Sequence, residues 1–472
     1  MSEAIVVGSG PNGLVCAALL ARAGVKVTVL EAQERIGGGT TTSELTLPGL
    51  LHDDCSAVHV MAVGAPSLNG LGLERYGLQW CWPEVDLAHP LDGGAGGVVL
   101  RSIEDTARGL GEDGRMWERV FGPSARGFAE LSEDIMRPIL HVPRHPLRLA
   151  RFGLPAATPA TQLARKFKTE PARALWGGCA AHAFRPLTQP MSSSVGMALI
   201  CAGHAHGWPV ARGGSRAISD ALAAVVEEHG GRIETGRPVT MLDELAEADA
   251  VVLDLAPGAV AEIAGARMPR RVARAYRRYK HGPGAFKVDL AVEGGVPWTN
   301  EATRKAGTVH AAGSFAEIVA GEREINRGRM PERPFVLVCQ QSLADPTRAR
   351  GDVHPVWAYA HVPSGYSGDA TEALLDQIER FAPGLRERIL ATSVRSTGQI
   401  EADNANYVGG DIITGANTPW QTVIRPRLAL DPYSTGIPGV FICSAATPPG
   451  AGAHGMNGYN AAKSVLQSLG ST

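Results

Sequence analysis

The sequence predicts an α/β fold built from two interleaved domains, and three observations indicate it. The chain has 472 residues, 44% of them apolar, which is enough to bury two connected cores. Residues 4–7 form an apolar run that meets a glycine-rich turn and then a helical pattern, which is typical of a strand followed by a helix. Later β-branched runs, between residues 285 and 361, predict a separate antiparallel or mixed sheet.

Charge and cysteine usage exclude several classes of protein. Lysine and arginine total 45 against 47 for aspartate and glutamate, so a net charge of -2 offers no general attraction to nucleic acid. The seven cysteines are scattered and no histidine cluster has zinc-ligand spacing, so we expect reduced thiols and no metal site. No apolar stretch approaches the roughly 20 residues that span a bilayer, and no leader precedes residue 4, so we expect a cytoplasmic protein.

The N-terminal segment predicts a strand, a turn, a helix and a second strand in immediate succession. The strands are expected at residues 4–7 and 25–30, and the helix at 14–23, with Gly24 as its C-cap. Such a unit is the usual start of a parallel sheet wound with helices on both faces.

The turn between the first strand and the helix has the glycine spacing of a dinucleotide-binding loop. Gly8 allows the tight turn, Gly10 lets the backbone approach a pyrophosphate, and Gly13 lets the helix pack close to the strand. Glu31 ends the second strand 18 residues after Gly13, where a carboxylate accepts hydrogen bonds from ribose hydroxyls. The strand, turn, helix and glutamate together predict a Rossmann-like domain, whereas the glycines alone are also compatible with a structural turn.

The segment after Glu31 favours FAD over NAD. Arg35, Gly37–Gly39 and Thr40 form a second glycine-rich stretch, which suits a long and extended cofactor. Near the other end of the chain, a loop at residues 448–458 opens a helix whose N-terminal amides would stabilise negative charge on a reduced flavin ring. Only one full glycine fingerprint is found and a redox cysteine pair is missing, so no second nucleotide domain is expected.

The remaining pattern divides the chain into two discontinuous domains. Residues 102–206 are mainly helical with proline-rich breaks, residues 215–230 and 458–469 predict further helices, and residues 232–234, 250–253 and 440–443 predict strands. We expect the FAD-binding domain at 1–75, 207–275 and 395–472, and a substrate domain of mixed sheet and helices at 76–206 and 276–394.

Three motifs resemble one family of flavoproteins. They are G-S-G-P-N-G-L from Gly8, W-P-V-A-R-G-G-S at residues 208–215, and the C-terminal C-S-A-A-T-P-P-G-A-G-A-H-G-M-N-G-Y-N-A-A from Cys443. The chain resembles the phytoene desaturase-related FAD-dependent oxidoreductases of the amine oxidase/phytoene dehydrogenase superfamily. The bacterial branch similar to pyridine nucleotide-disulphide oxidoreductase domain-containing protein 2 matches best. This resemblance implies a glutathione reductase-like fold and FAD bound without a covalent link.

The glycine pattern and the resemblance together indicate which residues contact FAD. Val239 is included only because the resemblance places it beside the adenine. The expected contacts are Gly8, Gly10, Pro11, Asn12, Gly13, Glu31, Ala32, Arg35, Gly38, Gly39, Thr40, Val239, Ser444, Gly452, His454, Gly455, Met456 and Asn457.

Two residues are candidates for catalysis. His454 stands in the loop expected to approach the flavin, where it would orient substrate or accept a proton; the alternative is a histidine that only hydrogen-bonds the turn. Lys287 is the positional analogue, by resemblance, of a lysine that reaches a water at the flavin in amine oxidases. Strand alternation places Lys287 and Asp289 on one face, and our preferred interpretation of that pattern is an ion pair facing solvent.

Substrate contacts are expected from His59, His182 and Trp208, because aromatic and histidine side chains near a flavin often enclose a planar or apolar substrate. Simple core packing is the alternative for each of them. Residues 136–154 mix apolar and arginine side chains between prolines. They suit either contact with a membrane surface or a lid over a substrate tunnel, and we favour the lid.

The expected function is an FAD-dependent dehydrogenase, desaturase or oxidase. A hydride would leave an apolar or aromatic small molecule for the flavin, and oxygen, a quinone or another acceptor would reoxidise it. Two alternatives stay open, a redox-neutral flavin-dependent isomerase and a scaffold without catalysis. Membrane contact is expected to be peripheral at most, and a homodimer is left open.

Overall fold

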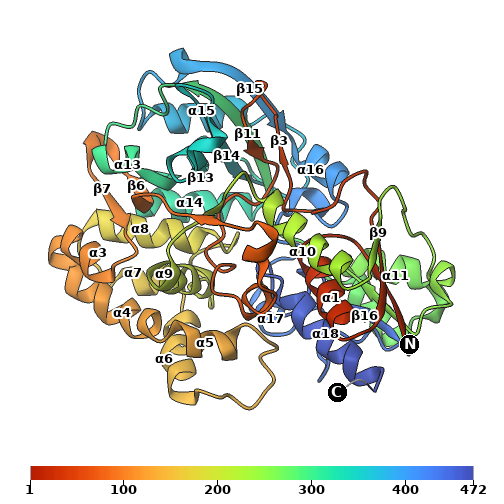
Figure 1. Ribbon diagram of the computed structural model, residues 1–472. Helices are drawn as coiled ribbons and strands as arrows, with labels where there is room; N and C mark the ends of the chain where they lie inside the picture. Colours follow the sequence, from red (N-terminus) through yellow and green to blue (C-terminus); the bar gives the residue numbers. More distant parts are fainter. Residues whose placement is uncertain (1, 471–472) are drawn as a thin grey trace.

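Five parallel strands form the first sheet of the computed structural model, which describes residues 2–470. Their order is β16-β10-β1-β2-β9, so strands from the two ends of the chain lie within one sheet (Figure 1). The strands are β1 (Glu3–Val7), β2 (Lys26–Leu30), β9 (Arg232–Glu234), β10 (Ala250–Leu253) and β16 (Val440–Ile442). The predicted Rossmann-like, parallel arrangement is confirmed.

Helices cover both faces of this sheet. On one face α1 (Pro11–Arg22), α10 (Arg216–Glu228) and α18 (Met456–Ser468) share an apolar core with Val6, Val29 and Val252. On the other face α11 (Pro257–Ala264) and α12 (Arg270–Arg277) pack against Val251 and Leu253. Because successive side chains of a strand point to opposite faces, strands covered on both sides are apolar throughout.

The first turn shows why glycine is needed at two positions. Gly8 has a φ of +98°, a conformation that L side chains rarely adopt. A Cβ atom at Gly13 would lie 2.1 Å from the Gly8 carbonyl oxygen, so the helix sits against the end of β1. The helix begins at Pro11, earlier than the predicted residue 14, because proline fits the first turn, where N–H groups have no helical partner.

Seven strands form the second sheet, in the order β15-β11-β14-β13-β12-β6-β7. All neighbours are antiparallel except β12 and β6, so the predicted mixed sheet is confirmed. The strands are β6 (Val85–Pro90), β7 (Gly96–Val99), β11 (Gly284–Glu293), β12 (Ala306–Ala311), β13 (Val336–Cys339), β14 (Val353–Val362) and β15 (Ile389–Arg395). β6 and β7 were not anticipated, because β6 contains polar residues and a proline and β7 is only four residues long and begins with two glycines.

A helical block lies below the second sheet, and shorter elements join the two halves (Figure 1). The block consists of α3 (Ile103–Gly109), α4 (Gly114–Arg126), α5 (Phe128–Ile135), α6 (Pro146–Ala156), α7 (Ala160–Ala164), α8 (Glu170–Ala181) and α9 (Ser194–His206). The shorter elements are the hairpin β3 (Thr42–Ser43) and β4 (His52–Asp53), the pair β5 (Trp80–Cys81) and β8 (Val210–Ala211), and α2 (Pro66–Asn69). The other helices are α13 (Glu301–Arg304), α14 (Phe315–Ile325), α15 (Thr371–Glu379), α16 (Thr397–Asp403) and α17 (Pro419–Val423).

The predicted helical character of residues 102–206 is confirmed, and so are the proline breaks. α5 ends at Ile135 and α6 begins at Pro146, so no continuous helix crosses the prolines between them. Within residues 2–470, none of the helices has the length and hydropathy needed to cross a membrane. All seven cysteines fall in this range and are free. The residue limits proposed for the two domains stay a prediction.

Candidate active site

One long cavity of about 550 Å³ joins the two sheets. At one end it is bounded by the carboxyl ends of β1 and β2, with Gly8 and Glu31, and at the other by Lys287, Trp357 and Tyr359 of β11 and β14. The sequence-predicted residues that line it are Gly8, Gly10, Pro11, Asn12, Glu31, Ala32, Arg35, Gly38, Gly39, Val239, Lys287 and Ser444. The tertiary structure therefore brings together residues from the start, the middle and the end of the chain.

The glycines of the loop have close neighbours on the side away from solvent. A Cβ at Gly10 would lie 2.7 Å from the Asp254 carboxyl oxygen, and a Cβ at Gly38 would lie 3.1 Å from the Gly10 Cα. A side chain at Gly10 would therefore collide with Asp254, and one at Gly38 would press on the glycine loop before the first turn of α1. The free N–H groups of that turn are a favourable environment for a phosphate.

Glu31 lies at the opposite edge of the same loop and is buried. Its Oε2 accepts hydrogen bonds from the Ser9 N–H at 2.8 Å and the Ser9 hydroxyl at 2.5 Å, and its Oε1 accepts one from the Gln33 N–H at 2.9 Å. A carboxylate offers about four acceptor positions, so capacity remains toward the cavity. The loop thus fixes the position of the Glu31 carboxylate with neutral donors and places no positive charge against it.

Asp254 is a cavity residue that the sequence analysis missed. It follows β10, the parallel neighbour of β1, and its Oδ2 accepts a hydrogen bond from the Gly13 N–H at 2.9 Å. Burial, with a contribution from the Glu31 charge, raises the pKa of Asp254 to about 7. The sequence did contain a signal for Asp254, because it directly follows a predicted strand. Parallel strands end at one edge of a sheet, and ligands bind at that edge.

Lys287 and Asp289 are buried, with side-chain exposures of 4% and 1%. The predicted solvent-facing pair is therefore wrong. The alternation itself is confirmed, since Phe286, Val288 and Leu290 pack in the core on the other face of β11. The pair is covered because β4 packs against β14, the neighbour of β11, and places His52 against Asp289.

The Lys287 ammonium is part of a buried polar chain at the end of the cavity. Its Nζ donates to Asp289 Oδ2, and Asp289 Oδ1 lies 3.4 Å from Nδ1 of His52. The Nζ also lies 5.6 Å from the centre of the Trp357 ring. Burial lowers the pKa of Lys287, although the Asp289 charge opposes this. A lysine with this environment is suited to hold or pass on a proton.

His454 lies outside the lining of this cavity. It is buried, its Nδ1 accepts a hydrogen bond from the Met456 N–H at 3.1 Å, and its carbonyl oxygen accepts one from the Ser67 hydroxyl. Burial lowers the pKa of His454 to about 4, so the ring is neutral at pH 7. These contacts are those of the turn-bonding alternative; the catalytic role stays a prediction.

Other predicted FAD contacts also pack beside the cavity rather than into it. Thr40 donates to the Gly37 carbonyl, and Asn457 donates to the Thr447 carbonyl. A Cβ at Gly455 would lie 2.4 Å from Val15, so the C-terminal loop is pressed onto α1. Gly13, Thr40, Gly452, His454, Gly455, Met456 and Asn457 lie outside the cavity lining. From this loop, Ser444 lines the cavity, and its hydroxyl has no hydrogen-bond partner within residues 2–470.

The predicted substrate residues do not line the cavity. His59, His182 and Trp208 belong to a layer of aromatic and imidazole rings beside it, in which His182 Nε2 lies 2.9 Å from Nε2 of His310. Tyr359 connects the two regions, since it lines the cavity and stacks on His361 at 5.6 Å. Their contact with substrate stays a prediction.

The segment after α16 closes one wall of the cavity and was also missed as a contact. The Asn406 amide donates to the Asp254 carbonyl at 3.0 Å and accepts from the Ala256 N–H at 2.7 Å, which ties the segment to the first sheet. Tyr407, next in the chain, faces Gly39 so closely that a Cβ there would lie 2.3 Å from the Tyr407 hydroxyl. Composition and periodicity do not distinguish these residues from an ordinary polar loop, and the resemblance of residues 406–412 to the family was the available signal.

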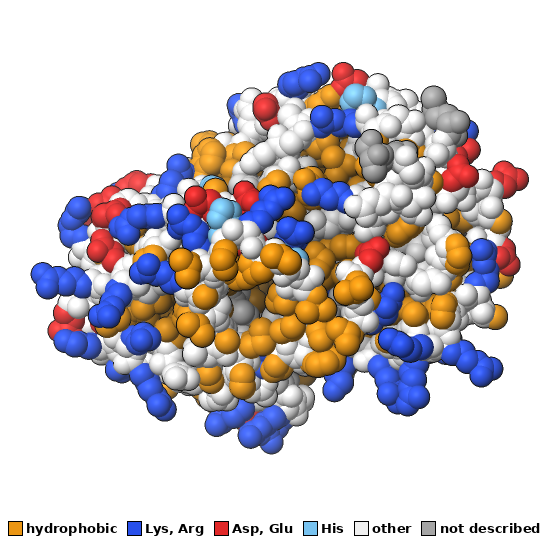
Figure 2. All heavy atoms as spheres, turned by 90° about the horizontal axis from the view of Figure 1, so that it is seen from below, with side chains coloured by type: hydrophobic (Ala, Val, Ile, Leu, Met, Phe, Trp, Pro, Cys, Tyr) orange, Lys and Arg blue, Asp and Glu red, His pale blue; other side chains and the backbone are white. Residues whose placement is uncertain are grey.

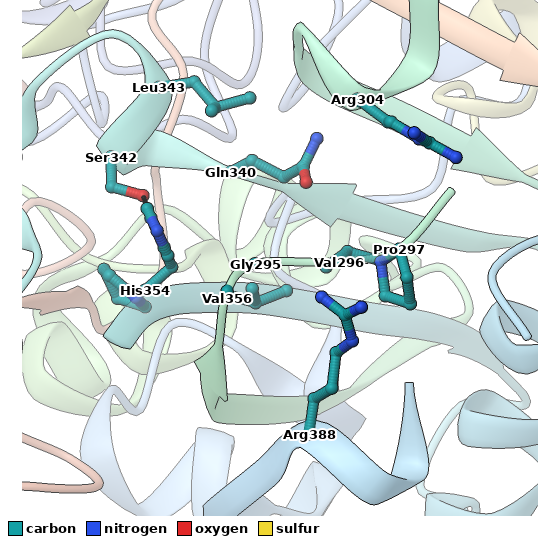
Figure 3. A pocket seen from close by; sticks show the side chains of 12 residues that line it. Gly295, Val296, Pro297, Arg304, Gln340, Ser342, Leu343, His354, Val356 and Arg388 are labelled. Carbon is teal, nitrogen blue, oxygen red and sulfur yellow. Dashed lines mark hydrogen bonds between the residues drawn. The ribbon is translucent and has the colours of Figure 1, made fainter. Parts of the chain in front are cut away.

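A second cavity of about 400 Å³ lies at the far end of β11 and β14 (Figure 3). Val296 and Val356 form part of its wall, and the side chains of Arg304, Arg388 and His354 stand around it. It contains none of the predicted site residues. The long cavity is therefore the candidate active site.

Comparison with known proteins is consistent with this geometry. Residues 6–69 match a family model described as an NAD(P)-binding Rossmann-like domain. Over 99% of its length the chain is 23% identical to pyridine nucleotide-disulfide oxidoreductase domain-containing protein 2 of Rattus norvegicus, 94% of which is covered. It is 28% identical to hydroxyneurosporene desaturase of Cereibacter sphaeroides over 51% of this chain and 50% of that protein.

The chain is similar to oxidoreductases of the phytoene desaturase-related class. A solved putrescine oxidase structure shares its fold, with a TM-score of 0.63, 16% identity and 99% coverage of both chains. In this fold the cavity joins a Rossmann-like domain to a second sheet.

Proposed function

We propose that FAD occupies the long cavity and that the protein removes a hydride from an apolar or aromatic small molecule. The observation that supports this most directly is the continuity of one cavity from Glu31 to Lys287. Its volume of about 550 Å³ lies within the roughly 300–1,000 Å³ typical of ligand sites. An extended dinucleotide suits a cavity that begins at a ribose-binding carboxylate and ends beside buried aromatic rings.

The residues present fit FAD in both shape and chemistry. Glu31 would accept hydrogen bonds from the ribose hydroxyls of the adenosine half, and the first turn of α1 would face the pyrophosphate. The unpartnered Ser444 hydroxyl offers a donor between the two halves of the cavity. When bound, the flavin supplies the capacity to accept a hydride and pass electrons to an acceptor.

The second sheet would supply orientation and proton handling. Trp357 and Tyr359 present apolar surface at the end of the cavity, which favours a substrate with little charge. Lys287 would hold a proton or a water molecule there, and Asp289 would keep the lysine in position. Lys287, Asp289 and His52 are all buried, so bulk water would be excluded from the reacting atoms.

Visible absorption of the purified protein tests the cofactor directly. We expect an oxidised flavin spectrum, and FAD identified by mass in the supernatant after acid denaturation. Candidate substrates are then added without oxygen, and bleaching of the spectrum reports hydride transfer. A colourless protein that stays colourless after FAD is added would reject the proposal in favour of a scaffold. Turnover without consumption of an electron acceptor would instead identify an isomerase.

Asp254 predicts how FAD affinity depends on pH. Its pKa is raised to about 7, so it is neutral below that pH and negatively charged above it. The charged form would repel the pyrophosphate that faces Gly10. We therefore expect the affinity of the apoprotein for FAD to fall about tenfold between pH 6 and 8, since a like charge within 4–6 Å is worth about one pKa unit or more. Fluorescence titration at each pH measures this.

The matched variants for this test are Asp254→Asn and Asp403→Asn. Asparagine keeps an acceptor for the Gly13 N–H but cannot ionise, so the pH dependence should disappear. Asp403 also lines the cavity but is exposed and paired with Arg395 at 3.0 Å, so its variant should retain the wild-type profile. An unchanged profile in Asp254→Asn would show that another group titrates.

A further inference from the structure

Large apolar side chains project into solvent from two segments of the lower face of the molecule. Val142 and Leu147 are 89% and 86% exposed, and Leu430 is 93% exposed. Figure 2 views the molecule from below and shows hydrophobic side chains gathered in the middle of this face, with lysine and arginine side chains around them. We call the exposed large apolar side chains of these two segments the lower apolar face; they are Ile139, Leu140, Val142, Leu147, Leu154, Trp420, Leu428 and Leu430.

The two segments lie on either side of α18, near its N-terminal end. The Asn460 amide of α18 donates to the Met136 carbonyl at 3.2 Å, and Met136 packs with Met456 in a small apolar cluster. On the other side, burial raises the pKa of Tyr433 and the nearby Arg137 guanidinium opposes this, so Arg137 lies close to the segment that contains Leu430. The two segments therefore meet at α18.

The loop before α6 is held open by a buried carboxylate. Asp134 accepts hydrogen bonds at 2.8 Å from the backbone N–H groups of Arg144 and His145, and at 2.9 Å from the His141 ring. These bonds fix the ends of the loop, while Val142 at its tip stays in solvent. The apolar tip is thus displayed in a fixed position instead of being packed inside. No residue of 136–154 lines either of the two cavities described above.

A strongly basic helix borders the same face. The segment 270–281, which includes α12, has six lysine and arginine residues and no acidic residue. Within residues 2–470, none of these six cations has a carboxylate within 4.0 Å. α12 also lies beside the loop that follows Leu430, since a Cβ at Gly436 would meet Pro269 at 3.3 Å and Val272 at 3.5 Å.

We propose that the lower apolar face docks on a bilayer surface rich in anionic phospholipid headgroups. Groups of exposed large apolar side chains mark interaction sites, and apolar tips beside unpaired cations match the boundary between acyl chains and charged headgroups. A second copy of this chain is a poorer partner, because it would bring the two basic segments together. Docking concerns the outer surface, so it does not depend on the bound cofactor.

Vesicle flotation with the full-length protein tests the docking. We expect the protein to float with phosphatidylcholine vesicles that contain phosphatidylglycerol, and to bind pure phosphatidylcholine far less. The double variant Leu147→Ser/Leu430→Ser should weaken binding about tenfold or more, because two large apolar groups lose their burial. The matched control is Leu390→Ser on β15, which is 50% exposed but lies at the top of Figure 1, far from this face.

The cations are tested separately. Arg270→Gln/Arg271→Gln should weaken binding about fivefold for each charge removed, whereas Arg323→Gln/Arg327→Gln, in the last turn of α14 and just after it, should not. Equal binding by the wild-type protein and both test variants would overturn the proposal, as would absence of binding to either vesicle. Light scattering provides the remaining check: a dimer that Leu147→Ser/Leu430→Ser dissociates would assign the face to self-association.

Discussion

Replacement of Glu31 by alanine is expected to give a folded protein that is purified without FAD. The side chain is the only predicted anchor for the ribose hydroxyls, and a hydrogen bond to a charged group contributes about 1.5–3 kcal/mol. Loss of two such bonds corresponds to a reduction in affinity of about 10²–10⁴-fold. The flavin content of the purified variant and titration of its apoprotein with FAD measure the effect.

Two controls separate binding from stability in this experiment. Glu31 also accepts from the Ser9 N–H and the Gln33 N–H, so its loss leaves buried donors unpaired. Glu31→Gln retains an acceptor and should recover part of the affinity. Glu34→Ala removes an exposed carboxylate that also borders the cavity and should bind FAD normally. Wild-type flavin content in Glu31→Ala would remove the ribose assignment.

Replacement of Lys287 by methionine should leave FAD bound but slow reactions that require a proton at the flavin. A positioned acid or base typically accelerates such a step by about 10²–10⁴-fold, and we expect a loss at the lower end of this range. The substrate need not be known, because the chemically reduced protein can be mixed with oxygen and its reoxidation followed by stopped-flow absorbance. An unchanged rate would leave Lys287 with a structural role only.

The buried partner of Lys287 requires a second variant. Removing the ammonium leaves Asp289 ionised and uncompensated, which typically destabilises a fold by about 3–5 kcal/mol. Lys287→Met/Asp289→Asn removes both charges and should restore the melting temperature without restoring the rate. Asp289→Asn alone keeps the lysine and tests whether the carboxylate positions it. This variant should alter the pH dependence of reoxidation more than its maximum rate, because the Asp289 charge acts on the pKa of Lys287.

The end of the candidate site that contains the glycine loop could be predicted because it is local in sequence. Gly8, Gly10 and Glu31 belong to consecutive elements, a strand, a turn, a helix and a strand, whose geometry is set by short-range hydrogen bonds. Spacing along the chain therefore translates directly into position in space. The second sheet could be predicted for the same reason, because runs of β-branched residues identify strands from the local sequence alone.

The other end of the site depended on contacts between distant segments. Asp254, Asn406 and Tyr407 reach the cavity only because β10 pairs with β1 and because the segment after α16 bonds to the end of β10. Strand β6 was missed for a related reason: its pairing with β12, more than 200 residues later, and not its own composition, makes it a strand.

By itself, the sequence determined the fold class, the glycine loop with its carboxylate, and the alternation that puts Lys287 and Asp289 on one face. Only the tertiary structure decided whether that face is exposed to solvent or buried. β4 packs against β14, the neighbour of β11, and places His52 beside Asp289, so the charges are buried at the end of the cavity instead of facing solvent. Periodicity records the direction of a side chain, but burial depends on which distant segment lies over it.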